Sequence, residues 1–106
     1  MNEKIKSVLE ILRHRFEIFY GYRLAHMVLF GSRARGDAES DSDIDVLVVL
    51  HGSVDAVEEI RRTSGIVSDL CLEYEVVISC VFMDLYRYKN KQGPLLRNIR
   101  KEGVAL

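Results

Sequence analysis

The chain has 106 residues, of which 48% are hydrophobic and 29% charged, and its formal net charge at pH 7 is −1. This length suits a single domain, expected to span residues 1–106, and leaves no room for two. The near-neutral charge provides no overall attraction to nucleic acid, so direct nucleic-acid binding is not expected and any phosphate site must be local. No apolar run approaches the ~18 residues of a membrane span, and residues 1–6 do not resemble a signal peptide, so we expect a cytoplasmic protein.

Hydrophobic periodicity divides the chain into helices and strands. Apolar residues at steps of three and four indicate amphipathic helices, and short aliphatic or β-branched runs indicate buried strands. Gly21, Gly52 and Gly103 follow such segments and are expected to end them. In chain order the prediction is a helix at 2–19, a strand at 23–30, a short helix after Gly31-Ser32, a strand at 44–50, a helix at about 54–72, a strand at about 75–82 and a short last helix that begins at Pro94.

This order of elements predicts an α/β (α+β) fold, in which a small mixed β-sheet is flanked by helices. A sheet of three short strands leaves edges and one face poorly covered. We therefore expect a partner protein, or a second copy of the chain, to complete the functional site. Cys71 and Cys80, the two cysteines, are expected to be buried free thiols rather than a disulfide.

The turn at Gly31-Ser32 has the features of a phosphate-binding turn. It interrupts a predicted buried strand and opens a short helix, where backbone N–H groups and the helix dipole favour phosphate. Gly31 lets the backbone approach a ligand closely, and the Ser32 hydroxyl adds a donor. Arg33 and Arg35 add positive charge nearby. We therefore predict that these four residues bind the phosphates of a nucleotide.

Asp43 and Asp45 stand two residues apart at the start of the predicted strand 44–50. Because side chains alternate along a strand, both carboxylates are expected to face the same way. Such a pair is costly unless a cation neutralises it, and Mg²⁺ prefers one or two carboxylates together with substrate phosphates. Each motif alone has an ordinary interpretation, as a common Gly-Ser turn or a solvated strand end. Their combination, one loop apart, favours a shared site for a magnesium-bound nucleoside triphosphate.

The pattern Gly31-Ser32-x-Ala34-Arg35-Gly36, followed by Ser42-Asp43-x-Asp45, resembles the signature of the DNA polymerase β-like nucleotidyltransferase superfamily. Within it, the small size and the ending at residues 94–103 are similar to minimal nucleotidyltransferase (MNT) proteins. The resemblance implies the polymerase β-like core, two Mg²⁺ ions and ATP as substrate. It also implies a helical HEPN-domain protein as partner. In such toxin–antitoxin pairs the MNT protein is the antitoxin and transfers AMP to a tyrosine of the toxin.

The superfamily usually has a third carboxylate on a neighbouring strand, which acts as general base and metal ligand. Glu75, at the expected start of strand 75–82, is the first candidate for both roles. Glu73 on the same face is an alternative, and Asp84 lies past the expected strand end. Glu75 is equally consistent with a solvated glutamate at a strand entry.

Two further functions compete with the protein adenylyltransferase. Without a third acid, the chain would be a catalytically weak or inactive nucleotide-binding antitoxin that neutralises its partner by forming a complex. A small-molecule adenylyltransferase is the third hypothesis, although the chain offers little material for an acceptor pocket. The gene beside this one is the simplest discriminator, because a small helical protein there favours the toxin–antitoxin interpretation.

Basic residues concentrate near the end of the chain. They are consistent either with a solvated helix face or with a docking surface for an acidic partner or for phosphates. They are Arg87, Lys89, Lys91, Arg97, Arg100 and Lys101.

Overall fold

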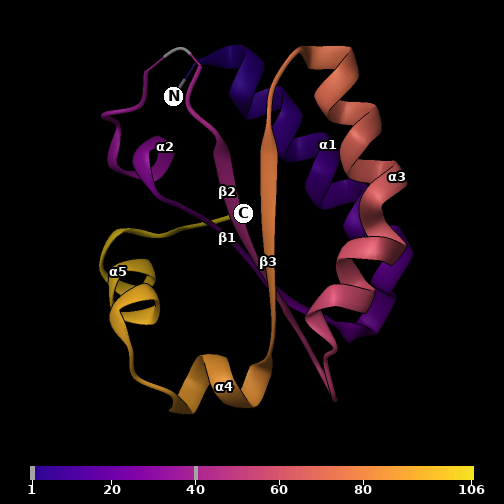
Figure 1. Ribbon diagram of the computed structural model, residues 1–106, viewed down its shortest axis with the longest axis vertical. Helices are drawn as coiled ribbons and strands as arrows, with labels where there is room; N and C mark the ends of the chain where they lie inside the picture. Colours follow the sequence, from indigo (N-terminus) through magenta and orange to yellow (C-terminus); the bar gives the residue numbers. More distant parts are fainter. Residues whose placement is uncertain (1, 40) are drawn as a thin grey trace.

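The computed structural model describes residues 2–39 and 41–106. A mixed β-sheet with strand order β3-β2-β1-β4 forms the centre, and helices lie on both of its sides (Figure 1). Strand β2 is parallel to β3 and antiparallel to β1, and β1 is antiparallel to β4. The elements are α1 (Glu3–Tyr20), the 3-10 helix η1 (Gly21–Arg23), β1 (Leu24–Phe30), α2 (Ser32–Arg35), β2 (Ile44–Leu50), α3 (Ala56–Tyr74), β3 (Ile78–Asp84), α4 (Leu85–Asn90), α5 (Pro94–Glu102) and β4 (Val104–Ala105).

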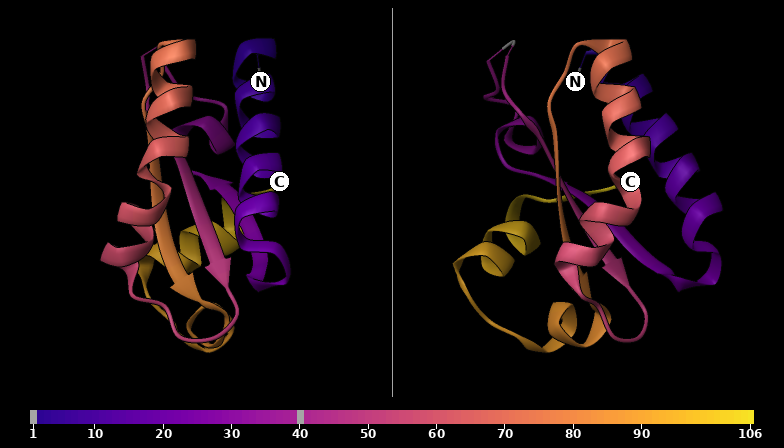
Figure 2. Two further views of the ribbon diagram at one scale, coloured as in Figure 1. Left: turned by 90° about the vertical axis from the view of Figure 1, so that its right-hand side faces the viewer. Right: turned by 45° about the vertical axis from the view of Figure 1, so that its right-hand side comes forward.

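Helices α1 and α3 pack side by side on one face of the sheet (Figure 2). Helix α1 begins where the Asn2 side chain accepts a hydrogen bond from the Ile5 N–H at 2.8 Å, and it ends at Gly21, whose φ of 57° suits glycine. Its apolar stripe and alternate residues of β2 form the main core of the molecule. The fully or nearly fully buried members from these two elements are Ile5, Val8, Leu9, Leu12, Phe16, Ile44, Val46, Val48 and Leu50.

The opposite face of the sheet carries the candidate site. Helix α5 covers part of this face, where Ile99 packs with Val28, Leu47 and Val49 in a second, smaller core. Because side chains alternate along β2, Asp45 points to the same face as Leu47 and Val49. Helix α2 lies on this side as well, at the end of β1 (Figure 1). The face is therefore shared by an apolar part under α5 and a polar part beside α2.

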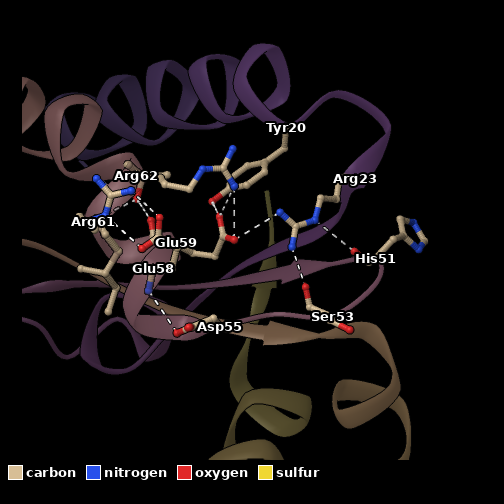
Figure 3. Close-up of polar contacts among 11 residues, drawn as sticks. Tyr20, Arg23, His51, Ser53, Asp55, Glu58, Glu59, Arg61 and Arg62 are labelled. Carbon is tan, nitrogen blue, oxygen red and sulfur yellow. Dashed lines mark hydrogen bonds and ion pairs between the residues drawn. The ribbon is translucent and has the colours of Figure 1, made fainter.

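A buried ionic network fastens the end of α1 and the loop after β2 to α3 (Figure 3). Glu59, 4% exposed, accepts a hydrogen bond from the Tyr20 hydroxyl at 2.8 Å and pairs with Arg23 at 3.3 Å and Arg62 at 3.0 Å. Arg23 also donates to two backbone carbonyls in the loop after β2. Burial, and then the Glu59 hydrogen bond and charge, raise the pKa of Tyr20, so its phenol stays protonated and donates. A buried carboxylate of this kind is tolerated because it is paired.

The predicted fold class and the order of the main elements are confirmed. The expected start of the third strand at residue 75 is wrong, because α3 continues through Tyr74 and β3 begins only at Ile78. The fourth strand and α4 were not predicted, because two and six residues are too few to show a periodic pattern. Among the described residues, no helix is long and apolar enough to cross a membrane.

Both cysteines are free thiols that pack against the main core, as expected. Burial raises the pKa of the Cys80 thiol to about 12, so it stays protonated at neutral pH. A protonated, half-buried thiol is a poor nucleophile. The pair therefore belongs to the packing of α3 against β3.

Candidate functional site

The predicted phosphate turn follows β1 directly and opens α2. Gly31 has φ 77° and ψ −157°, a backbone conformation that favours glycine. Its carbonyl accepts hydrogen bonds from the N–H groups of Ala34 and Arg35, both at 3.1 Å, and these bonds start α2. The first N–H groups of a helix have no acceptor within the helix. The Ser32 N–H therefore lies at the open start of α2.

Asp45 lies directly against this turn. A Cβ atom at Gly31 would lie 2.5 Å from Oδ2 of Asp45, closer than non-bonded atoms approach. The antiparallel register of β1 and β2 creates this contact, because Phe30 pairs with Asp45. Gly31 is thus needed for its positive φ and for the space that the carboxylate occupies. The predicted phosphate turn and Asp45 therefore lie side by side.

Asp43 immediately precedes β2, and Asp45 is the second residue of that strand. Ile44 between them is fully buried on the opposite side, against α1 and α3, whereas Asp43 is exposed and Asp45 half-buried. Burial and, secondarily, the negative charge of Asp43 raise the pKa of Asp45 above its usual range. A bound cation would lower the pKa of Asp45 again, because it stabilises the ionised carboxylate. Magnesium commonly takes one or two carboxylates as ligands. The pair therefore fits one Mg²⁺ ion.

The neighbouring strand supplies no acid beside this pair. The parallel register of β2 and β3 sets Asp45 opposite Ser79, which is exposed. Within residues 2–39 and 41–106, no three His, Cys, Asp or Glu side chains are grouped so that they could hold a metal ion. A second metal ion would need a ligand that the described side chains do not bring to Asp43 and Asp45 in this conformation.

Glu75 lies at the end of α3 and not on β3. It adopts a left-handed conformation, with φ 55° and ψ 50°, and caps the helix through its backbone. Its exposed side chain borders a cavity of about 260 Å³ that is also lined by Arg33 and Ser42. The expectation that Glu75 opens the third strand is therefore wrong, because β3 begins at Ile78. Its proposed roles as base and metal ligand stay predictions.

The two alternative acids are placed differently from what the sequence suggested. Glu73 lies in the last turn of α3, so it does not share a strand face with Glu75. Asp84 is the last residue of β3, opposite Leu50, and its side chain caps α4 by accepting from the Arg87 N–H at 2.8 Å. Leu50 and Asp45 lie near opposite ends of β2, so Asp84 is remote from the carboxylate pair.

Arg33 and Arg35 both make contacts within the chain. Arg33 donates from Nη2 to the Ser42 carbonyl at 3.0 Å, which ties α2 to the loop that precedes the carboxylate pair. Arg35 is exposed and pairs with Asp37 at 3.2 Å and Glu102 at 3.5 Å. Arg33 thus orders the site, and Arg35 links α2 to the end of α5. Phosphate binding by either arginine stays a prediction.

An apolar cavity of about 590 Å³ lies between α3 and the edge strand β3. None of its lining residues is charged, and the lining includes Ile60, Val67, Leu72 and Phe82. Such a lining offers nothing to neutralise a triphosphate. The turn and the carboxylate pair, and not this cavity, are the candidate nucleotide site.

Comparison with known proteins finds similarity along nearly the whole chain. A family model described as "Nucleotidyltransferase domain" matches residues 5–106. Over 113 aligned residues the chain is 35% identical to a Methanocaldococcus jannaschii protein named "Putative protein adenylyltransferase". That match covers 100% of this chain and 99% of the relative.

Solved structures share the fold at low sequence identity. A crystal structure of a toxin–antitoxin with AMP-PNP has a TM-score of 0.62 and 18% identity, covering 98% of this chain and 72% of the other. A complex of a tri-AMPylated Shewanella oneidensis HEPN toxin with its MNT antitoxin has a TM-score of 0.53 and 18% identity, covering 96% of this chain and 67% of the other. At these identities the similarity shows the fold alone.

Proposed function

The chain belongs to the nucleotidyltransferase domain family, and on that premise we propose that it transfers AMP from magnesium-bound ATP to a hydroxyl group of a protein. We propose further that the acceptor is a tyrosine of a HEPN-type helical partner and that the chain acts as its antitoxin. The contact between Gly31 and Asp45 carries the proposal, because it joins a phosphate-binding turn to a metal-binding carboxylate.

The residues of the site have distinct roles in this proposal. The backbone at Gly31 and the N–H and hydroxyl of Ser32 bind the terminal phosphates. Asp43 and Asp45 hold Mg²⁺, which when bound neutralises phosphate charge and polarises the phosphoryl group. Arg33 keeps the loop before the carboxylates in place through the Ser42 carbonyl.

The transfer itself is an in-line displacement at the α-phosphorus of ATP. The acceptor oxygen forms a bond to that phosphorus while the bond to the oxygen bridging the β-phosphate breaks. Pyrophosphate leaves, AMP stays esterified to the acceptor, and the hydroxyl proton passes to a base or to water. Glu75 is the base that the sequence suggests, but its side chain is exposed at the end of α3, so we expect water to accept the proton. A second Mg²⁺ would require a further ligand from Glu75 or from the acceptor protein.

Related proteins support this acceptor class. The M. jannaschii relative is named a protein adenylyltransferase, and the fold neighbours include an AMPylated HEPN toxin bound to an MNT antitoxin. Another neighbour is a toxin–antitoxin that contains AMP-PNP. Each combines the same fold with adenine nucleotide chemistry or a protein acceptor.

The test is incubation with labelled ATP, MgCl₂ and a HEPN-type protein encoded beside this chain, read by intact mass and peptide mapping. We expect AMP on a tyrosine of the partner, dependent on magnesium and lost in the Asp43→Asn/Asp45→Asn double variant. Circular dichroism checks that the double variant is folded. Modification that persists in the double variant would overturn the assignment of the site.

One observation favours a second candidate, an antitoxin that binds nucleotide and neutralises its partner by complex formation alone. Ser79 stands opposite Asp45, where an acid would be needed to complete a cluster of three carboxylates on adjacent strands. In that case the same incubation gives a stable complex with no added mass on the partner. The parent chain would still bind Mg-ATP through Asp43 and Asp45.

A further inference from the structure

Charge is unevenly distributed along the chain. Residues 85–101, which comprise α4, its connection to α5 and all of α5 except its last residue, Glu102, contain six basic residues and no acidic residue. The rest of the chain contains nine basic and sixteen acidic residues. The six basic side chains of the segment are all exposed, and we call them the α4–α5 basic surface: Arg87, Lys89, Lys91, Arg97, Arg100 and Lys101.

Most of these charges face solvent without an acidic neighbour. In the part of the chain that the structure describes, Arg87 is the one member with an ion pair, to Asp84 at 3.5 Å. Arg100 instead donates to the backbone carbonyls of Tyr88 and Lys91. These two bonds join α5 to α4, so the helices present one continuous surface. The remaining positive charges are available to an external anionic group.

Helix α5 lies on the same side of the sheet as α2 (Figure 1), and residues of α4 and α5 pack against the face of β2 that carries Leu47 and Val49. Ile99 anchors α5 on the face that Leu47 and, by alternation along β2, Asp45 also occupy. The ion pair between Arg35 and Glu102 brings the last turn of α5 beside the phosphate turn. A molecule bound along this surface is therefore directed toward the carboxylate pair.

The opposite end of this face is acidic, because residues 37–45 contain five acidic residues and no basic residue. A nucleic acid carries uniform negative charge, so one end of the face would attract it and the other would repel it. A protein can match both ends. Tyr86 and Leu95, 69% and 42% exposed, add apolar area among the basic side chains. Tyrosine and arginine together are typical of protein interfaces.

We propose that the α4–α5 basic surface docks an acidic segment of the acceptor protein and so delivers its hydroxyl group to the carboxylate end of the face. The identity of the acceptor as a protein rests on the proposed function. The docking is a binding event that is measured without transfer. Because the contact is electrostatic and exposed, it is expected to weaken as ionic strength rises.

A fluorescently labelled block copolymer is the probe, with a glutamate–tyrosine block joined to a lysine block, since it can match both ends of the face and carries acceptor hydroxyls. Its binding is measured by anisotropy at low and physiological salt. The test variant is Arg97→Glu/Lys101→Glu on α5. The matched control is Arg15→Glu/Arg61→Glu, which changes net charge equally on the α1–α3 side. We expect the α5 variant to bind about tenfold more weakly, and the control to stay within about twofold of the parent.

Three outcomes would overturn the proposal. These are no binding of the copolymer to the parent, an equal loss in both double variants, or an RNA of similar length that binds the parent more tightly than the copolymer does. Labelled AMP transfer to the copolymer is recorded in parallel. Binding without transfer supports the docking surface and counts only against the proposed acceptor chemistry. Unchanged Mg-ATP binding by the α5 variant shows that the nucleotide site is intact.

Discussion

The Oδ2 oxygen of Asp45 occupies the space that a side chain at Gly31 would fill, since a Cβ atom there would lie 2.5 Å from it. The contact exists because β1 ends at Phe30, the register partner of Asp45. A strand that turns immediately after this pair must place its turn beside the carboxylate. The predicted phosphate turn and Asp45, a predicted metal ligand, are thereby set next to each other by a single strand pairing.

Gly31→Ala is expected to weaken Mg-ATP binding by about tenfold or more and to destabilise the fold by about 1–2 kcal/mol, because the new Cβ displaces Asp45 and φ stays positive. Calorimetry and urea unfolding measure the two effects. Gly36→Ala is the matched control, since Gly36 has φ 84° with nothing within 4 Å of an added Cβ. If the two variants bound Mg-ATP equally well, the contact with Asp45 would not matter for the site.

Asp45→Asn should stabilise the metal-free protein while abolishing magnesium-dependent ATP binding. The folded pKa of Asp45 is raised by burial and by Asp43, so its ionised form is disfavoured in the folded state. The parent therefore loses stability as pH rises from the ordinary pKa of an aspartate through the raised one, and the variant does not. Thermal unfolding between pH 3 and pH 8, with and without MgCl₂, measures the difference in stability between the parent and the variant.

Magnesium should restore the stability that the parent loses as pH rises, and it should not stabilise the Asp45→Asn variant. The control is Asp41→Asn, because Asp41 is exposed in the loop before the pair. A variant Asp45→Asn that is less stable than the parent at pH 8 without metal would contradict the assignment of Asp45 as a carboxylate awaiting a cation.

Ser79→Asp should increase magnesium affinity by about tenfold, because it adds a carboxylate opposite Asp45 in the β2–β3 register. The same substitution should lower stability without metal, since a third negative charge joins the face. Magnesium titration followed by calorimetry measures the first effect. Ser79→Asn has the same shape without the charge and should leave magnesium affinity unchanged. Equal affinities in the two variants would show that position 79 does not face the metal site.

Glu75→Gln should change single-turnover transfer by less than about threefold, because its side chain is exposed at the end of α3 and acts through solvent. Glu73→Gln, in the last turn of the same helix, is the matched control. A loss of orders of magnitude in Glu75→Gln alone would identify Glu75 as base or metal ligand, since both functions would disappear together. That result would confirm the roles predicted for Glu75 from the sequence.

Glu59→Gln should destabilise the fold by about 2–3 kcal/mol, because it removes the charge that Arg23 and Arg62 share and disturbs the bond from Tyr20. The adjacent Glu58 is exposed, so Glu58→Gln should leave the free energy of unfolding nearly unchanged despite its pair with Arg61. Urea unfolding measures the free energy of unfolding of both variants. Mg-ATP affinity should be the same in both folded variants, because the network lies on the other side of the sheet from Asp45. Equal losses of stability in Glu59→Gln and Glu58→Gln would show that the burial of Glu59 does not make its ion pairs more important than those of Glu58.

The sequence by itself determined the main helices and strands and the glycine turn that separates β1 from α2. These features are local: periodicity marks the buried stripe of α1, and the aliphatic run marks β2. The face on which Asp45 lies was predictable for the same reason, since alternation along a strand needs no knowledge of its neighbours. Asp43 immediately precedes β2, and its place on the same face stays a prediction. The resemblance to nucleotidyltransferases, carried by this segment, is confirmed at the level of the family.

Only the tertiary structure decided what lies beside these residues. The end of α3 at Tyr74, and with it the start of β3, depends on the left-handed conformation of Glu75, which side-chain hydrophobicity does not encode. The register of β3 then brings Ser79, and not Glu75, opposite Asp45. Likewise, the contact between Gly31 and Asp45 and the common side of α5 and the carboxylates arise from pairing between distant segments. Hydrogen-bond register and packing select those neighbours, and no pattern within a single segment contains them.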